Sequence, residues 1–436
     1  MLDEVNKGEL MLGKLFRISL YTFSFLLPFE NILGQIRFGF LGGVKVFGLL
    51  ILYLLILYIV ESRKKFNILI KNLLNPISVI LFLFIMWNMM SVVWAPKATW
   101  ALTRVYTYIG LFTIMQAVGL LKRHHIKIMW VCLLIGAALS VPVGFILPPP
   151  SELIAASGRF SSGGQNPNDY ANLIVITAIV GWFGILTEVK RQLVRLSLMG
   201  AALIALMAVP FTLSRTALIT FIVIVAISFL SRRNLRTSIK LTLIISIFTP
   251  LILVLYSDRV EQIIQRYSTL ESIQQEDTWA GRIDLWRTAI MLFNKHPVTG
   301  VGAANFAYIS PHYSYEAARI AATREDGGGG VAHNMFLSVL SETGLIGLFL
   351  FGALLSFAYR SAWYLAKNKE ALGYGLLLAL IAYTIAGMTL TWEYVKIPYV
   401  IYGSLLALRR EVNNAQGTRS PHPPQLWPRR GGALGA

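Results

Sequence analysis

The stretch Val46–Val60, VFGLLILYLLILYIV, decides the class of this protein, because it runs without a single charged or strongly polar residue. Leu173–Leu186, LIVITAIVGWFGIL, has the same character. Such segments suit the hydrocarbon interior of a bilayer, which a helix of about 20 residues crosses. Of the 436 residues, 56% are hydrophobic and 14% are charged, whereas soluble domains carry about 25% charged residues. The expected fold is an all-α, polytopic integral membrane protein.

Apolar stretches of spanning length recur along the chain and predict about twelve transmembrane helices. They lie near residues 15–34, 44–60, 76–94, 101–121, 126–147, 169–187, 193–210, 213–230, 239–256, 334–358, 371–390 and 393–408. No small-residue cleavage site follows the first run, which is therefore expected to stay as a helix and not to be removed as a signal peptide. The expected organisation is helices 1–9 in residues 1–256, a periplasmic loop in 257–333, helices 10–12 in 334–410, and a disordered or appended tail in 411–436.

The net charge of +18 is distributed as a topology signal and not as a nucleic-acid surface. If the connections alternate across a membrane, one side holds 25 Lys and Arg against 7 Asp and Glu, and the other side holds 14 of each. The whole surplus falls on one side, as the positive-inside rule requires of cytoplasmic loops. We expect a multi-pass protein of the bacterial inner (cytoplasmic) membrane with both termini in the cytoplasm. Membrane lipids, and no nucleic acid, are its expected partners.

The connection Ser257–His333 is much longer than the usual connection between helices and falls on the outer side. SDRVEQIIQRYSTL (257–270) and WAGRIDLWRTAIMLFNK (279–295) repeat apolar residues at helical spacing, and Pro297 and Gly300 end the second helix. Helices of this kind are expected to lie on the outer membrane surface, between spans 9 and 10. A second external loop covers about 148–168 and contains GRFSSGGQNPND (158–169).

Two arginines stand where a cation is costly. Arg215 begins a span in VPFTLSRTALITF, with no other charge in its short connection; the ordinary explanation is a residue that extends to the interface, and the alternative is a bound anion. Arg282 lies near the start of its amphipathic helix, where the helix dipole disfavours a cation. It is either a solvated residue, as we assume for Arg287, or a ligand of an anion.

His333 is the sharpest candidate for chemistry, because histidine is the natural general base for a hydroxyl nucleophile near neutral pH. It follows the glycine run Gly327–Gly330, which suggests a mobile lid. The ordinary explanation is a helix cap, but Asn334 is the better cap. Arg159, in a Gly/Ser-rich loop, would be a free surface charge unless it bound something.

Glu342 is expected at membrane depth, where an ionisable group is a site or a partner of one; its expected role is to hold His333, an arginine or the helix bundle together. The external acids lack the spacing of metal ligands, so no metal and no cofactor are expected. The single cysteine, Cys132, lies in an apolar run and is an improbable nucleophile.

Three arginines and one histidine on the outer face suit a lipid-linked diphosphate. A guanidinium group binds two phosphate oxygens at once, through two parallel hydrogen bonds, and keeps its charge. Arg159, Arg215 and Arg282 would therefore bind the donor diphosphate and stabilise it as a leaving group without metal. A synthetic reaction outside the cell needs a donor that is already activated. A polyprenyl-diphosphate-linked glycan is such a donor, with His333 taking the proton of an acceptor hydroxyl.

The stretches GRIDLW…HPVTGVGAANF, AHNMFLSVLSETGLIG, SRTAL and GRFSSGGQNPN resemble the O-antigen ligase/polymerase superfamily of bacterial envelope glycosyltransferases, over about residues 15–408. The resemblance implies about twelve spans and one large periplasmic loop. It also implies transfer of a polysaccharide from undecaprenyl diphosphate to lipid A–core oligosaccharide. The family's essential histidine falls on His333 and its essential arginines fall on Arg215 and Arg282, with Asn334 and Glu342 in supporting positions.

Members of this superfamily differ mainly in the acceptor. Ligases use lipid A–core, polymerases use a growing glycan, and oligosaccharyltransferases use protein. The chain lacks the extra C-terminal region usual in protein-acceptor enzymes, and one external loop dominates, which favours a ligase. A transporter or flippase of lipid-linked sugars is the alternative from another class; its arginines would bind but not react.

Overall fold

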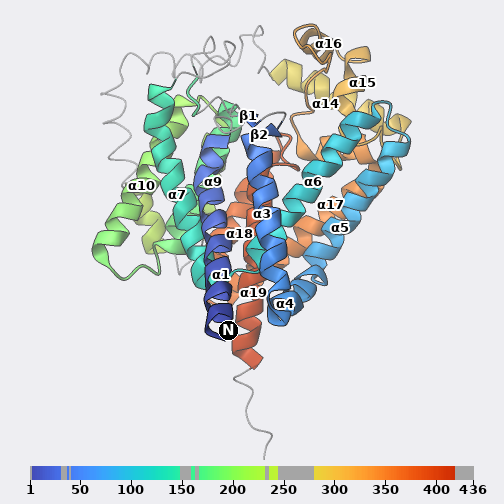
Figure 1. The fold of residues 1–436 in the computed structure, drawn as a ribbon. Coiled ribbons are helices and arrows are strands. Elements are labelled where there is room, and N and C mark those ends of the chain that lie inside the picture. The colour runs from blue at the N-terminus through green and yellow to red at the C-terminus, as the bar shows by residue number, and fades with distance from the viewer. Residues whose placement is uncertain are drawn as a thin grey trace, which may run out of the picture.

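The computed structural model describes residues 2–30, 37–38, 41–147, 159–162, 166–230, 235–243 and 279–417. These residues form a bundle of long helices with a group of shorter helices at one end (Figure 1). The predicted helix at 257–270 and most of the predicted ninth span lie outside the described residues. So do the predicted loop residues 148–158 and 163–165 and the tail from residue 418.

The bundle follows the predicted apolar stretches closely. Its helices are α1 (Leu2–Leu26), α3 (Gly43–Val60), α5 (Pro76–Met90), α6 (Ala98–Gly119), α7 (Arg123–Ile146), α9 (Pro167–Ile179) continued by the π-helical turn η3 (Val180–Ile185), α10 (Gln192–Phe211), α11 (Arg215–Phe229), α17 (Met335–Lys367), α18 (Ala371–Gly387) and α19 (Lys396–Gly417). Short elements join them: η1 (Leu27–Phe29), η2 (Ser91–Val93), α4 (Arg63–Leu73) and the antiparallel strand pair β1 (Arg37–Phe38) and β2 (Leu41–Gly42).

Several of these helices have the length and composition to cross a membrane. Among the described residues, five such segments are Pro76–Val93, Arg123–Ile146, Pro167–Ile185, Gln192–Phe211 and Met335–Lys367. Shorter apolar helices cover Gly48–Val60, Arg215–Phe229 and Ala371–Gly387. Apart from the short pair β1 and β2, the regular elements of the described residues are helices, so the predicted helical, polytopic character is confirmed. The number of twelve spans remains a prediction.

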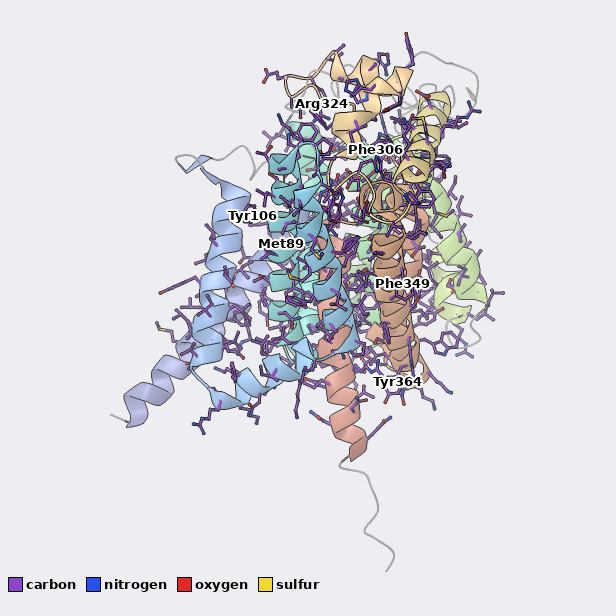
Figure 2. All side chains as sticks on the ribbon, turned by 90° about the vertical axis from the view of Figure 1, so that its right-hand side faces the viewer. Met89, Tyr106, Phe306, Arg324, Phe349 and Tyr364 are labelled. Atoms are coloured by element: carbon purple, nitrogen blue, oxygen red, sulfur yellow. The ribbon has the colours of Figure 1, made fainter. Side chains whose placement is uncertain are left out.

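The bundle has two distinct ends. α1 begins and α19 ends at one of them, the terminal end, and α14 (Trp279–Lys295), α15 (Phe306–Ile309), η4 (Ser310–His312) and α16 (Tyr315–Ala321) lie at the other, the loop end (Figure 1). Figure 2 shows Tyr364 at the terminal end, Phe306 and Arg324 at the loop end, and Phe349 between them. Phe349 is exposed, as expected of a side chain that faces lipid.

The core is built around α18, whose Leu376 and Tyr383 are fully buried. Gly375 of this helix packs directly on Gly184 of η3, where an added Cβ would lie 3.0 Å from the Gly184 Cα atom. Helices in a bilayer associate by such close backbone contact, because lipid tails provide no hydrophobic drive between them. α18 is therefore the central helix against which η3, α9, α11, α17 and α19 pack.

The basic connections meet at the terminal end. Arg123 bonds Glu188 at 3.0 Å and Glu370 at 2.8 Å, and Arg410 donates to the Leu121 carbonyl at 2.9 Å. Lys127 pairs with Glu188 as well. Connections that the charge pattern assigned to one side of the membrane thus share one end of the bundle.

The last helix is longer than predicted. α19 runs to Gly417, past the expected end near residue 408, so the first part of the predicted tail is helical. The cause is that its final turns find partners on α17: the Tyr364 hydroxyl contacts Asn413 at 3.0 Å and Gln416 at 2.9 Å. These hydrogen bonds to α17 stabilise the last turns of α19, in a segment whose composition predicted disorder.

Candidate functional site

The helix predicted at 279–295 is present as α14, and the turn that follows it docks on α17. Val301 N donates to the Ser341 carbonyl at 2.9 Å, and Gly302 N donates to the Glu342 carbonyl at 2.8 Å. α17 is kinked at this point, at Gly344. The kink leaves these carbonyls accessible to the turn, so two motifs far apart in sequence form one joint.

Glycine is required on both sides of this joint. Gly300 has φ +65°, and a Cβ there would lie 2.3 Å from the Glu342 carbonyl carbon. Gly344 has φ +66°, and a Cβ there would lie 2.2 Å from the Val298 carbonyl oxygen. Other residues rarely adopt this backbone conformation. The glycines of HPVTGVG and SETG therefore fasten the loop-end helices to the bundle.

His333 stands immediately before α17, in the left-handed region with φ +50°. Asn334 caps the helix as predicted, accepting from Phe336 N at 2.9 Å and Leu337 N at 3.1 Å. The His333 carbonyl accepts from Trp286 Nε1 of α14 at 3.4 Å. A left-handed conformation is uncommon for a non-glycine residue and costs energy, so the surrounding contacts hold His333 in place.

Arg282 lies four residues before Trp286 on α14, so the two residues share a helix face. Because Trp286 contacts His333, the turn of α14 that carries Arg282 adjoins the start of α17. We call Arg282, His333 and Asn334 the histidine group. Two of the residues predicted to form the site are thus brought near each other by neighbouring elements.

The glycine run before His333 is packed over its last three residues, whereas Gly327 is exposed. Gly328, Gly329 and Gly330 are buried, and Gly329 N donates to the Ala307 carbonyl at 2.7 Å. An added Cβ at Gly329 would lie 2.8 Å from Pro311. These glycines permit close approach of neighbouring segments, and the predicted lid finds no support in this arrangement.

Arg159 and Arg215 form a second group, the arginine group, around the turn between α10 and α11. Arg159 is only 9% exposed; its Nε donates to the Thr212 carbonyl at 3.0 Å and its Nη2 donates to Asn168 Oδ1 at 2.7 Å. Arg215 is half-buried at the first position of α11, directly after the cap Ser214. The Arg159 side chain thus binds groups of the protein itself and is not a free surface charge.

The connection between α18 and α19, residues 388–395, joins the two groups. Thr389 bonds Thr216, next to Arg215, at 2.7 Å. Trp392 Nε1 donates to Asp169 Oδ1, next to Asn168, at 2.6 Å. On the other side, Ser338, one turn inside α17, donates to Glu393 Oε1 at 2.8 Å. The predicted spans 371–390 and 393–408 left only Thr391 and Trp392 between them, so the central place of this segment was not predicted.

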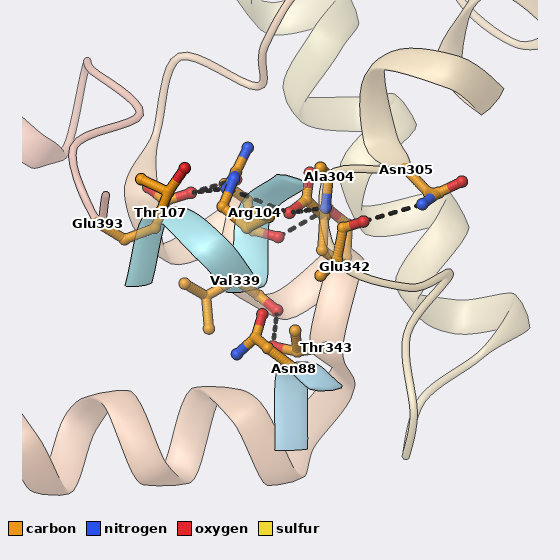
Figure 3. Close-up of polar contacts among 12 residues, drawn as sticks. Asn88, Arg104, Thr107, Ala304, Asn305, Val339, Glu342, Thr343 and Glu393 are labelled. Carbon is orange, nitrogen blue, oxygen red and sulfur yellow. Dashed lines mark hydrogen bonds and ion pairs between the residues drawn. The ribbon is translucent and has the colours of Figure 1, made fainter. Parts of the chain in front are cut away.

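A buried cluster of charges lies beside this connection (Figure 3). Arg104 Nη1 is 3.3 Å from Glu393 Oε1 and 3.6 Å from Glu342 Oε2, and its guanidinium lies 3.8 Å from the Tyr394 ring centroid. Ala304 N of the docked turn donates to Glu342 Oε2 at 2.8 Å. Exposed fractions are 13% for the Arg104 side chain, 8% for Glu342 and 1% for Glu393.

Glu342 therefore contacts an arginine, which was one of its expected roles, but this arginine, Arg104, was not among the predicted site residues. Arg104 stands alone in the apolar stretch ALTRVYTYIG (101–110). A lone cation within a predicted span is the signal that could have found it. Glu393 carried no comparable signal, because its burial depends on the fold around the connection.

Burial dominates the electrostatics of Glu393 and raises the pKa of its carboxyl to about 7. Arg104 opposes this shift and the neighbouring Glu342 adds to it. Among the described residues, no hydrogen-bond partner reaches the buried Oε2 atom of Glu393. The carboxyls of Glu342 and Glu393 thus share the Arg104 guanidinium, and the pKa of Glu393 is the one raised to about 7.

A cavity of about 180 Å³ adjoins the same connection at the loop end. Polar residues from three elements contribute to its lining: Glu30, Asn166, Asp169 and Lys396. Lys396 and Glu30 form an ion pair there. The cavity is close to the arginine group, because Asn166 and Asp169 flank Asn168, the partner of Arg159.

The fold and these groups define a polytopic membrane protein with guanidinium and imidazole side chains gathered at one end. Residues 200–352 match the family model described as O-antigen ligase. The match confirms the predicted resemblance to the O-antigen ligase superfamily over a stretch that contains Arg215, Arg282 and His333. Arg104, Arg159 and Glu393 lie outside it. No curated protein matches the chain.

Proposed function

We propose that this protein is a glycosyltransferase that moves O-antigen polysaccharide from undecaprenyl diphosphate to a hydroxyl of lipid A–core oligosaccharide. The observation that carries the proposal is the family match over 200–352, which contains Arg215, Arg282 and His333. The packing of the Arg282-bearing helix on the segment that holds His333 supports it. The reaction takes place at the loop end, which is the periplasmic end of an inner-membrane protein of about twelve spans.

The donor suits this architecture in each of its parts. The polyprenyl tail remains among lipids beside the bundle, the diphosphate reaches the interface, and the glycan extends into water. Arg215 and Arg282 contact the diphosphate, since each guanidinium can form two parallel hydrogen bonds to phosphate oxygens. Arg159 adds a fixed positive charge beside Arg215 while its Nε and Nη2 hold the α10–α11 turn and Asn168.

The transfer is a single displacement with inversion. The acceptor hydroxyl oxygen forms a bond to the anomeric carbon while the bond from that carbon to the diphosphate oxygen breaks. The hydroxyl proton goes to His333, and undecaprenyl diphosphate leaves with the electron pair of the broken bond. The arginines stabilise the charge that develops on it. This account requires no metal, and Asn334 and Glu342 support the position of His333.

In vitro transfer by the full-length protein in nanodiscs tests the proposal, with lipid-linked donor offered to lipid A–core and to free glycan in parallel. His333→Ala should lower the transfer rate by a factor of about 10² to 10⁴, the usual contribution of a general base. His312→Ala is the matched control, an exposed histidine of the same region, and should leave the rate unchanged.

Three other outcomes would each change the proposal. Preference for the glycan acceptor would indicate a polymerase. Donor movement across the membrane that His333→Ala leaves intact, without transfer, would indicate a transporter. Loss of transfer in EDTA with recovery in Mg²⁺ would show that the arginines do not act alone. Arg282→Met should abolish most of the activity, whereas Arg287→Met, an exposed arginine of the same helix, should not.

A further inference from the structure

The cluster of Arg104, Glu342 and Glu393 has a geometry that stability alone does not explain. A well-satisfied Arg–carboxylate pair forms two parallel hydrogen bonds. Here the Arg104 Nη1 atom lies between two different carboxylates, and the part of the chain that the structure describes provides no hydrogen bond to the buried Glu393 Oε2 atom. Buried ion pairs of this kind are often replaced by apolar residues without loss of stability. The arrangement therefore calls for an explanation beyond holding the protein folded.

The position of the cluster of Arg104, Glu342 and Glu393 suggests a role, because it lies between the two groups of the candidate site. Through Glu342, Arg104 contacts α17 and the docked turn, since Glu342 also accepts from Ala304 N. These are the elements that carry the histidine group. Through Glu393, Arg104 contacts the 388–395 connection, which bonds the neighbours of Arg215 and of Asn168 through Thr389 and Trp392. One guanidinium is thus in contact with both halves of the site.

The two halves also meet at Ser338, whose hydroxyl donates to Glu393 Oε1 from the first turns of α17. A shift of Glu393 would therefore move the connection relative to the start of α17. Reactions that join two bound substrates depend steeply on such distances, and a displacement of about 1 Å can cost about 100-fold in rate. A rigid contact at this point has a direct consequence for catalysis.

We propose that Arg104 and Glu393 are positioning residues that fix the histidine group and the arginine group at the separation that glycan transfer requires. This inference rests on the proposed function. Neither residue contacts the substrates in this account; both act through the segments that carry His333, Arg282, Arg159 and Arg215. The guanidinium sets the geometry from one side and the Glu393 carboxyl transmits it to the connection.

Steady-state kinetics separate positioning from binding. Arg104→Met should lower kcat by about 100-fold, the cost of a displacement of about 1 Å, with little change in the KM for the lipid-linked donor. Arg104→Lys keeps the charge and should recover part of kcat. Glu393→Gln keeps the shape and the contact with Ser338 and should be milder than Glu393→Ala. Arg324→Met, which removes an exposed pair with Asp326 at the same end, is the matched control and should leave kcat unchanged.

A distance measurement tests the same idea without any activity. In a Cys132→Ser background, nitroxide labels at Ile219 of α11 and Tyr315 of α16, both exposed side chains, report the separation of the two halves by pulsed EPR. Arg104→Met should shift or broaden this distance distribution, and Arg324→Met should not. If Arg104→Met fails to fold, Arg104→Met combined with Glu393→Gln, which removes one of the two carboxylates left without a cation, takes its place in both measurements.

The outcomes are distinct. A shifted distance together with a lower kcat and unchanged donor KM supports the proposal. An unchanged distance overturns it, whether kcat stays at the wild-type value or falls, because a fall would then reflect a direct role of Arg104 in the reaction. If the wild-type protein transfers glycan to no acceptor, the proposed function fails, and the distance measurement alone decides whether Arg104 positions the two halves.

Discussion

Two charge clusters of the same composition lie at opposite ends of the bundle. At the terminal end, Arg123 lies between Glu188 and Glu370; at the loop end, Arg104 lies between Glu342 and Glu393. The Arg123 side chain is 42% exposed and the Arg104 side chain is 13% exposed. The Arg123 guanidinium is thus in contact with water, although Glu370 beside it is buried, whereas all three side chains of the Arg104 cluster are enclosed by the protein.

The contrast in exposure changes how much each ion pair contributes to stability. Water screens the Arg123 cluster, and exposed pairs contribute little to stability. The Arg104 cluster has lost its hydration and depends on its internal contacts, so removing one partner leaves an uncompensated charge. We expect the terminal cluster to join helix ends loosely and the loop cluster to fix the elements around the candidate site.

Arg104→Met should have the largest effect on stability. It leaves Glu342 and Glu393 buried beside each other without a cation, and breaking such a pair typically costs about 3–5 kcal/mol. The apparent melting temperature in detergent should fall by several degrees or more, measured by differential scanning fluorimetry. Restoration by Arg104→Met with Glu393→Gln, which removes one carboxylate, would tie the loss to charge; no restoration would point to lost packing against Tyr394.

The pH dependence of stability should reveal the Glu393 carboxyl. Its folded-state pKa of about 7 lies above the value of about 4.3 expected for an exposed glutamate. The stabilising contribution is therefore complete below about pH 4 and is lost as the pH rises through 7. The loss is about 4 kcal/mol at most, because the two pKa values differ by about 2.7 and each pKa unit corresponds to 1.36 kcal/mol. Thermal scans between pH 5 and 8 should show a steeper decline for wild type than for Glu393→Gln. Parallel curves for the two proteins would contradict the assignment.

The joint between the docked turn and α17 should be the next most sensitive feature. Gly344→Ala forces a Cβ to 2.2 Å from the Val298 carbonyl in a left-handed backbone conformation, and we expect a loss of about 2–3 kcal/mol, since strained backbone alone costs about 1–3 kcal/mol. Gly352→Ala, in the same helix with no atom within 4 Å of the added Cβ, is the control. It should stabilise the helix by up to about 1 kcal/mol. Equal melting temperatures for the two variants would mean that the joint relaxes freely.

Much of the fold follows from local chemistry that the sequence makes visible. The apolar stretches predicted the helices of the bundle, Pro297 predicted the end of α14, and Asn334 was predicted as the cap of the helix that follows it. The end of α19 could not be predicted in the same way. Its last turns depend on contacts with Tyr364 of α17, which composition does not report.

The types of residue in the candidate site could be predicted from the sequence, but the contacts that join its two groups could not. Arg215, Arg282 and His333 stood out because each is polar beside an apolar helix. The route between them runs through Thr389, Trp392 and Glu393, three ordinary residues in a short connection. Their importance arises from packing between helices that are far apart in sequence. Whether such a residue joins two parts of a site depends on its neighbours in space, and sequence periodicity does not report these neighbours.

Arg123→Met should have the smallest effect, and it completes the comparison of the two clusters. The side chain is exposed, and Lys127 remains to pair with Glu188, so we expect a loss of at most about 1 kcal/mol, the usual range for exposed pairs. Because salt screens exposed charges, the difference from wild type should shrink further in 0.5 M NaCl, whereas the Arg104→Met difference should persist. Melting temperatures at two salt concentrations measure both. A loss of stability in Arg123→Met that does not depend on salt and equals the loss in Arg104→Met would show that exposure does not separate the clusters. The buried Glu370 of the terminal cluster would then act as Glu393 does at the loop end.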